Sequence, residues 1–106
     1  IKSFDSVVKN YKENRDKSSK ILEKMSLLEY SMPSGAFYFY VNIEKLKIDS
    51  SDLVKKLLKY TGVALTPGVD FDTVNGNKTI RISFSSDQKS LLSALKLFYK
   101  WYKANY

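Results

Sequence analysis

The sequence predicts an α+β fold in which helices cover a small mixed, largely antiparallel sheet. Two observations lead to this prediction. Apolar residues recur at helical spacing in three segments, and alternating or aromatic-rich runs lie between those segments. The predicted order is helix, strand, helix, strand, strand, helix. At 106 residues, of which 43% are hydrophobic, the chain fits a single domain, 1–106, with a modest core.

One long helix is predicted from Asp5 to Leu28, because apolar residues occur there among charged ones at mostly helical spacing. Segment 31–35 interrupts that pattern with a proline and a glycine, which disfavour a continuing helix. Segment 36–41 is short and aromatic, and it predicts the most clearly defined strand.

A second helix is predicted to begin at Ser50 or Ser51, since either side chain can cap a helix N-terminus. Gly62 supplies the stop signal for this helix. A short strand is then predicted at 63–65, followed by a turn at 66–68.

The last strand and the last helix are predicted from two regular patterns. Segment 78–85 alternates, with apolar residues on one face and polar residues, including Arg81, on the other. Segment 85–88 matches a helix-capping box, and the apolar residues of 91–102 form the stripe of a helix. The connection 68–78 is long for a compact domain, so a functional role is worth considering there.

The composition excludes several kinds of site. The chain has no cysteine and no histidine, so disulfides, thiol catalysis, Ser-His-Asp triads and zinc sites are not expected, and no metal site is predicted. No apolar stretch approaches the roughly 18 residues of a membrane span, and no secretory leader is recognised, so we expect a soluble, cytoplasmic protein. The net charge is +7, but lysines recur along the whole chain, often beside acidic residues, which indicates a solvated surface.

Three segments in order resemble the C-terminal domain of the class I/II aminotransferases that use pyridoxal phosphate: 33–38 (Pro-Ser-Gly-Ala-Phe-Tyr), 62–71 (Gly-Val-Ala-Leu-Thr-Pro-Gly-Val-Asp-Phe) and 80–85 (Ile-Arg-Ile-Ser-Phe-Ser). The resemblance extends over nearly the whole chain. It implies the small domain of a longer enzyme that transfers an amino group between an amino acid and a 2-oxo acid. It also implies a large domain of the same chain that holds pyridoxal 5'-phosphate, and a homodimer when the protein is complete.

For Arg81, the resemblance implies that the guanidinium binds the α-carboxylate of the substrate. The chemistry agrees, because arginine presents a planar fork that matches a carboxylate with two parallel hydrogen bonds, whereas lysine offers a point charge. Arg15 is the only other arginine. From strand alternation alone, Arg81 could be an ordinary exposed strand residue. For Arg15 we expect a helix-surface or domain-junction salt bridge with Asp16 or Glu13.

The resemblance implies weaker roles for four other residues. Phe37 matches an aromatic position near the substrate in related enzymes, although core packing explains it equally well; Tyr38 could also help to shape the substrate pocket, and its role is left open. The turn with Pro67 and Gly68, together with Phe71, matches the mobile edge that closes near the active site, and a plain surface loop is the alternative. Phe71 is followed by aspartate where many relatives have glycine, so the local turn geometry stays open.

No catalytic residue is predicted within the chain itself. The resemblance implies cofactor chemistry that needs a Schiff-base lysine, an acidic partner for the pyridine nitrogen and polar groups at the phosphate. Ser19 and Lys20 lie inside the first predicted helix and are poor candidates for such a site. We therefore expect these 106 residues to be inactive on their own.

Two other functions remain as alternatives. Basic charge, eight tyrosines and the aromatic segment 35–39 suit a nucleic-acid-binding module, but the segment lacks the basic residue and the spacing of an RNA-recognition motif. The chain could also be a free-standing interaction domain that kept the fold without the enzyme. We favour the aminotransferase interpretation, with amino-acid and 2-oxo-acid substrates and with neither nucleic acid nor a membrane as partner.

Overall fold

The computed structural model describes residues 4–32, 37–61, 65–70, 74–85 and 87–106. In chain order, its helices and strands are α1 (Phe4–Glu23), β1 (Glu29–Ser31), β2 (Tyr38–Asn42), α2 (Ser50–Thr61), β3 (Thr66–Pro67), β4 (Thr79–Ser83) and α3 (Gln88–Asn105). The strands form one sheet in the order β1-β2-β4-β3, and every pairing among them is antiparallel. The predicted α+β fold class is confirmed.

The central pair of strands, β2 and β4, supplies the apolar face of the sheet. Phe39 pairs with Ile82 and Val41 pairs with Ile80, so these four side chains project to the same face. All four are buried, with at most 2% of each residue exposed. The alternation predicted for segment 78–85 therefore places Ile80 and Ile82 in the core.

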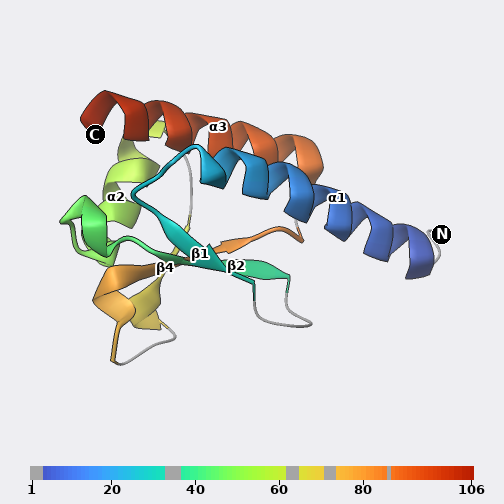
Figure 1. Cartoon of the computed structure of the whole chain (residues 1–106), viewed down its shortest axis with the longest axis horizontal. Helices are drawn as coiled ribbons and strands as arrows, with labels where there is room; N and C mark the ends of the chain where they lie inside the picture. The colour runs from blue at the N-terminus through green and yellow to red at the C-terminus, as the bar shows by residue number, and fades with distance from the viewer. Residues whose placement is uncertain (1–3, 33–36, 62–64, 71–73, 86) are drawn as a thin grey trace.

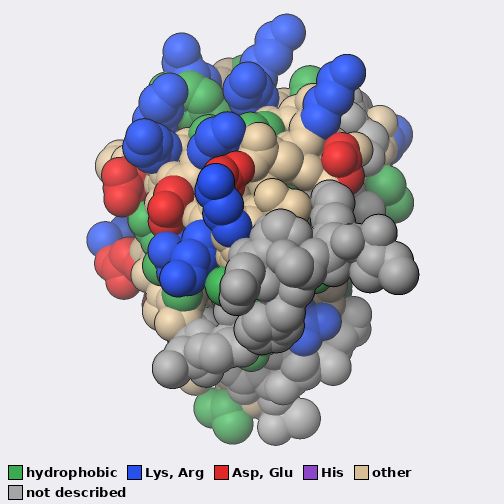
Figure 2. All heavy atoms as spheres, turned by 90° about the vertical axis from the view of Figure 1, so that its right-hand side faces the viewer, with side chains coloured by type: hydrophobic (Ala, Val, Ile, Leu, Met, Phe, Trp, Pro, Cys, Tyr) green, Lys and Arg blue, Asp and Glu red, His purple; other side chains and the backbone are tan. Residues whose placement is uncertain are grey.

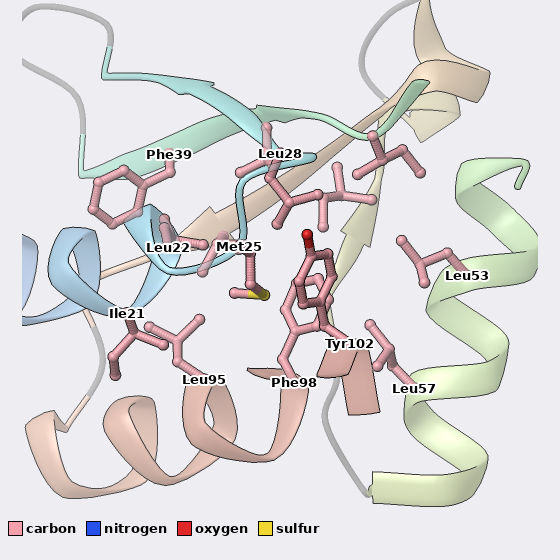
Figure 3. Close-up of a cluster of buried hydrophobic side chains, with 14 of the residues drawn as sticks. Ile21, Leu22, Met25, Leu28, Phe39, Leu53, Leu57, Leu95, Phe98 and Tyr102 are labelled. Atoms are coloured by element: carbon pink, nitrogen blue, oxygen red, sulfur yellow. The ribbon is translucent and has the colours of Figure 1, made fainter. Parts of the chain in front are cut away.

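The helices cover that apolar face. Helices α1 and α3 lie side by side over the sheet and run in the same direction, while α2 packs at one end (Figure 1). Side chains from the three helices and the sheet point toward one another in the core (Figure 3), among them Leu22, Met25, Phe39, Leu53, Leu57, Leu95 and Phe98. The opposite face of the sheet carries no α-helix in the part of the chain that the structure describes.

Helix α1 ends at Glu23, earlier than the predicted Leu28. The prediction was wrong there because Met25 and Leu28 keep helical spacing and are buried, yet they lie beyond the helix. The amide of Met25 bonds to the carbonyl of Leu22 and the amide of Leu28 bonds to the carbonyl of Met25, each at 3.0 Å. Such bonds to the third residue back tighten the chain into a turn.

Two short edge strands were not predicted. Strand β1 has only three residues and exists through its pairing with β2, where Tyr30 lies opposite Val41. At the other edge, Thr66 and Pro67 form β3, although the sequence predicted a turn there. A proline is tolerated on an edge strand because its missing N–H costs no sheet bond. Most of the strand predicted at 63–65 lies outside the described residues.

The cap of α2 differs from the prediction. The Oδ1 of Asp49 accepts a hydrogen bond of 3.0 Å from the amide of Ser51, so Asp49 caps the helix instead of either serine. Ser50 is buried, and its Oγ donates a hydrogen bond of 2.6 Å to the carbonyl of Gly76. The serine therefore ties the start of α2 to the turn before β4.

The cap of α3 lies inside the predicted capping box. The Oδ2 of Asp87 accepts hydrogen bonds of 3.1 Å from both the amide and the hydroxyl of Ser90. These two bonds lower the pKa of Asp87 below its ordinary value. The aspartate, rather than Ser85 at the start of the box, closes the first turn of the helix.

Basic side chains gather over the helical layer. Figure 2 shows lysines clustered at the top of the molecule, over the helices, with acidic side chains among them. Every lysine whose side chain the structure describes is exposed, which agrees with the predicted solvated surface. Helix α3 contributes four lysines and no acidic residue: Lys89, Lys96, Lys100 and Lys103. No described helix is both long enough and apolar enough to cross a bilayer.

Candidate functional site

Arg81 lies at the centre of β4, on the face of the sheet opposite to the core. Its strand neighbours Ile80 and Ile82 are buried, so alternation turns the Arg81 side chain to the face without a described α-helix. On the neighbouring strands, Arg81 pairs with Tyr40 of β2 and with Thr66 of β3. The residue is half-buried, so water would only partly screen the attraction between its charge and that of a bound anion.

Tyr38 supports the guanidinium of Arg81. The Cζ of Arg81 lies 5.2 Å from the centre of the Tyr38 ring. Tyr38 pairs with Ser83, two residues beyond Arg81, so the two side chains are diagonal neighbours on one face. The ring attracts the cation without neutralising it. The role of Tyr38 was left open from the sequence, but its alternation with the buried Phe39 would have placed it on the face of Arg81.

A recess of about 210 Å³ opens beside Arg81, between β3, β4 and α3. It is lined by apolar residues, by hydroxyl-bearing residues and by Arg81: Leu65, Thr66, Arg81, Ile82, Ser83, Ser90, Leu91, Ala94 and Leu95. Pockets for small ligands usually enclose about 300–1,000 Å³. The recess is smaller than that, and it borders α3, which covers the face of the sheet opposite to the Arg81 side chain.

A second recess of about 440 Å³ lies over β1, β2 and the start of β4. Its two glutamates each pair with a lysine: Glu29 with Lys45 at 3.0 Å, and Glu44 with Lys78 at 3.5 Å. These side chains are exposed, so each pair adds little to stability. Because the paired charges cancel, these residues give the recess little net charge to attract a single anion.

Phe37 lies just before β2 and is 48% exposed. Its ring centre is 4.6 Å from that of Tyr11 on α1 and 6.3 Å from that of Phe84. In the alternation of the strand it matches the buried Phe39, so it lies toward α1 and the structure does not bring it beside Arg81. A contact between Phe37 and the substrate stays a prediction.

The residues predicted to form a closing edge lie near the start of β4. Pro67 is half-buried in β3. Gly68 is buried, and a Cβ there would overlap the Thr79 hydroxyl and lie 2.7 Å from the Thr79 carbonyl oxygen. Only glycine fits that contact, which holds the turn against β4. Phe71 lies outside the described residues, and closure of this edge stays a prediction.

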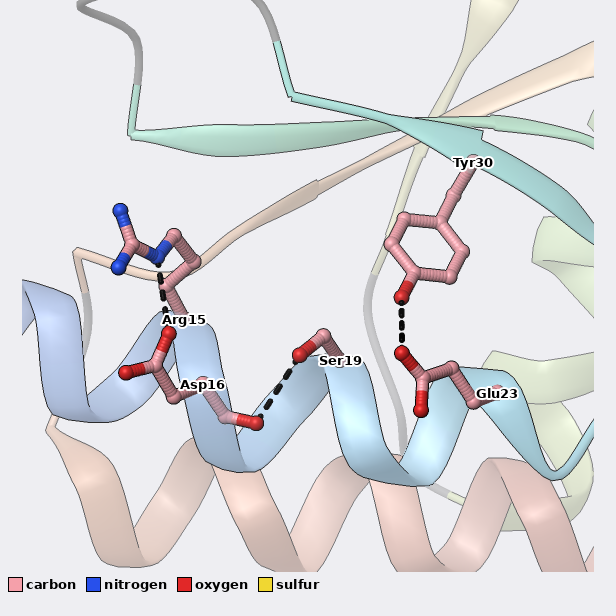
Figure 4. Close-up of polar contacts among 5 residues, drawn as sticks. All are labelled: Arg15, Asp16, Ser19, Glu23 and Tyr30. Carbon is pink, nitrogen blue, oxygen red and sulfur yellow. Dashed lines mark hydrogen bonds and ion pairs between the residues drawn. The ribbon is translucent and has the colours of Figure 1, made fainter.

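Arg15 takes part in a surface ion pair on α1. Its Nε lies 3.0 Å from the Oδ1 of Asp16 (Figure 4), which confirms the predicted pairing. Nearby, the Oη of Tyr30 donates a hydrogen bond of 3.1 Å to Glu23, and burial together with this bond raises the pKa of Tyr30 above its ordinary value. Of the two arginines, only Arg81 belongs to the uncovered face of the sheet.

The sequence resembles those of known aminotransferases. The profile of the family described as "Aminotransferase class I and II" matches residues 1–97. The valine–pyruvate aminotransferase of Mycobacterium tuberculosis is 34% identical over 97 residues, which cover 92% of this chain and 25% of that protein. The aspartate aminotransferase of Pyrococcus horikoshii is 30% identical, over 89% of this chain and 24% of that protein.

Solved structures agree. The crystal structure of an aminotransferase from Mycobacterium tuberculosis matches with a TM-score of 0.87 at 33% identity, covering 94% of this chain and 26% of that one. The aromatic aminotransferase from Pyrococcus horikoshii matches with a TM-score of 0.82 at 29% identity, covering 91% and 25%. The chain spans about a quarter of the length of the curated relatives it matches. With the family profile matched over residues 1–97, the chain belongs to the class I and II aminotransferases.

Proposed function

We propose that this chain is the C-terminal small domain of an aminotransferase, and that Arg81 binds the α-carboxylate of its amino-acid and 2-oxo-acid substrates. The observation that carries the proposal is the place of Arg81: it lies at the centre of β4, on the face of the sheet that no described α-helix covers, with its guanidinium against the ring of Tyr38. The names of the relatives support amino-group transfer as the reaction of the complete protein.

Arg81 suits a carboxylate because of its geometry and its surroundings. Two N–H groups of one guanidinium can bond to both oxygens of a carboxylate, which fixes the orientation of the ligand as well as its position. Tyr38 limits the directions that the side chain can take. The role of Arg81 is therefore to bind and orient the substrate, and no bond is made or broken at this residue.

The family uses pyridoxal phosphate, and the described part of this chain does not fit that cofactor. A lysine that forms an imine needs burial or a neighbouring cation to become a nucleophile. Every lysine whose side chain the structure describes is exposed on the surface. We therefore assign the cofactor to a large domain of the same polypeptide. The homodimer that we propose for the complete enzyme is what the resemblance to the family implies.

The test is Arg81→Lys in the complete protein. Lysine keeps the charge but loses the fork, and a hydrogen bond to a charged group is worth about 1.5–3 kcal/mol. We expect kcat/KM to fall by about 10- to 100-fold for the amino acid and for the 2-oxo acid alike. Absorbance of the bound cofactor should not change, because Arg81 is not assigned to hold it.

Arg15→Lys is the matched control. It replaces the only other arginine, which is paired with Asp16 on the surface of α1, and should leave kcat/KM unchanged. Unchanged substrate kinetics in Arg81→Lys, with normal cofactor absorbance, would show that Arg81 does not bind the substrate carboxylate.

A further inference from the structure

The side chain of Asn14 joins three elements of the fold. Asn14 lies on α1 and is 3% exposed. Its Nδ2 donates a hydrogen bond of 3.0 Å to the carbonyl oxygen of Phe84, directly after β4, and its Oδ1 accepts one of 3.1 Å from Gln88, the first residue of α3. A buried amide is stable only when its polar atoms are paired. Asn14 therefore holds the end of β4 and the start of α3 to α1.

A hydrogen bond between Lys17 and Gln88 fixes the orientation of the Gln88 amide and, through it, that of the Asn14 amide. The Nζ of Lys17 donates a hydrogen bond of 3.0 Å to the Oε1 of Gln88. Gln88 is thus oriented with its amide NH2 group toward the oxygen of Asn14. Asn14 must then turn its own NH2 group toward Phe84, which is the donor that a backbone carbonyl needs.

Phe84 connects this amide to Arg81. The amide of Phe84 donates a hydrogen bond of 2.9 Å to the carbonyl of Phe37, just before β2. Both backbone polar groups of Phe84 are therefore held, one beside β2 and one at α1. Arg81 precedes Phe84 by three residues of extended chain, roughly 10 Å. The position in which Phe84 is held therefore determines the position of Arg81 relative to α1.

We propose that Asn14 is a positioning residue for Arg81: by holding the end of β4 to α1, it keeps the guanidinium where the substrate carboxylate binds. This inference rests on the proposed function of Arg81. An Asn14 that did no more than pair a buried carbonyl would affect stability alone. An Asn14 that acts through Arg81 affects carboxylate binding only while the arginine fork is present.

The test is a double-mutant cycle in the complete protein, with Asn14→Ala, Arg81→Lys and the double variant. The readout is the Kd of an unreactive carboxylic acid that lacks the amino group, measured by calorimetry, with unfolding followed separately. We expect Asn14→Ala to weaken binding about tenfold in the presence of Arg81 and by much less in the Arg81→Lys background. Ser18→Ala is the matched control: Ser18 is buried on the same helix, its hydroxyl has no hydrogen-bond partner within the described part of the chain, and its substitution should leave Kd unchanged.

Equal weakening by Asn14→Ala in both backgrounds, or none in either, would overturn the inference. Gln88→Ala provides a second variant if Asn14→Ala does not fold, since Gln88 is less buried. It should weaken binding in the same direction, again only in the presence of Arg81, and an unchanged Kd counts against the inference. If Arg81→Lys itself leaves Kd unchanged, the proposed function fails; if only the Asn14 and Gln88 variants leave it unchanged, the positioning role alone fails.

Discussion

Two buried polar residues on α1 are expected to respond in opposite ways to truncation. Ser18 is fully buried, and its hydroxyl has no hydrogen-bond partner among the described residues. Asn14 is almost as buried, but its amide bonds to Phe84 and to Gln88. Alanine at position 18 removes an unpaired polar group, whereas alanine at position 14 removes a paired one.

The magnitudes follow from those contacts. Burying a hydroxyl without a hydrogen bond costs about 1–3 kcal/mol, and alanine also favours a helix over serine by about 0.5 kcal/mol. After some loss of packing, Ser18→Ala should raise the free energy of unfolding by about 1 kcal/mol. Asn14→Ala leaves the carbonyl of Phe84 unpaired and breaks a second bond, so it should lower the free energy of unfolding by about 2–3 kcal/mol.

Urea unfolding of the 106-residue chain measures both changes. Trp101 is the only tryptophan, and its ring packs 6.4 Å from Phe98 and 5.9 Å from Tyr106, so its fluorescence reports the packing of α3. We expect the midpoint to rise for Ser18→Ala and to fall for Asn14→Ala. A lower midpoint for Ser18→Ala would contradict this expectation, because it would show that the hydroxyl is paired or fills space that the core needs.

Three further predictions concern the turn, the cap of α3 and the C-terminus. Gly68→Ala should lower the free energy of unfolding by at least about 2 kcal/mol, since the Cβ of the alanine would overlap Thr79. An unchanged melting temperature would show that the backbone of the turn can shift to make room for the methyl group. Because Ser90 lowers the pKa of Asp87, the stability that this carboxylate contributes is present above its ordinary pKa and lost as pH falls through the lowered one. Asp87→Asn should remove that part of the acid dependence, and an NMR titration midpoint of Asp87 at the ordinary carboxyl value would contradict the expectation. Burial raises the pKa of Tyr106, so the stability that the neutral phenol contributes is present below the ordinary phenol pKa and lost as pH rises through the raised pKa. Tyr106→Phe should therefore reduce the loss of stability at alkaline pH. An unchanged alkaline loss of stability would argue against this.

The parts of the fold that follow local periodicity were predictable. The alternation around Arg81 indicated β4, and the apolar stripe from Leu91 to Tyr102 indicated α3. The end of α1 was not predictable, because Met25 keeps helical spacing while the chain has already turned. Strand β1 has too few residues for a pattern, and only the opposing β2 makes it a strand.

Contacts between distant residues explain the remaining differences. Ser50 is a reasonable cap by sequence, but its hydroxyl bonds to Gly76, 26 residues away, and Asp49 is left to cap the helix. The bond between Asn14 and Phe84 spans 70 residues and has no local signal. The face of Arg81 was predictable from alternation, whereas its neighbours required the register between strands.

The most direct measurement is a crystal structure of the complete protein with a bound substrate or an unreactive carboxylic acid. We expect two nitrogen atoms of Arg81 to lie about 2.7–2.9 Å from the two carboxylate oxygens, with Tyr38 still against the guanidinium. A carboxylate held by other residues, with Arg81 turned away from it, would contradict the proposed role of Arg81.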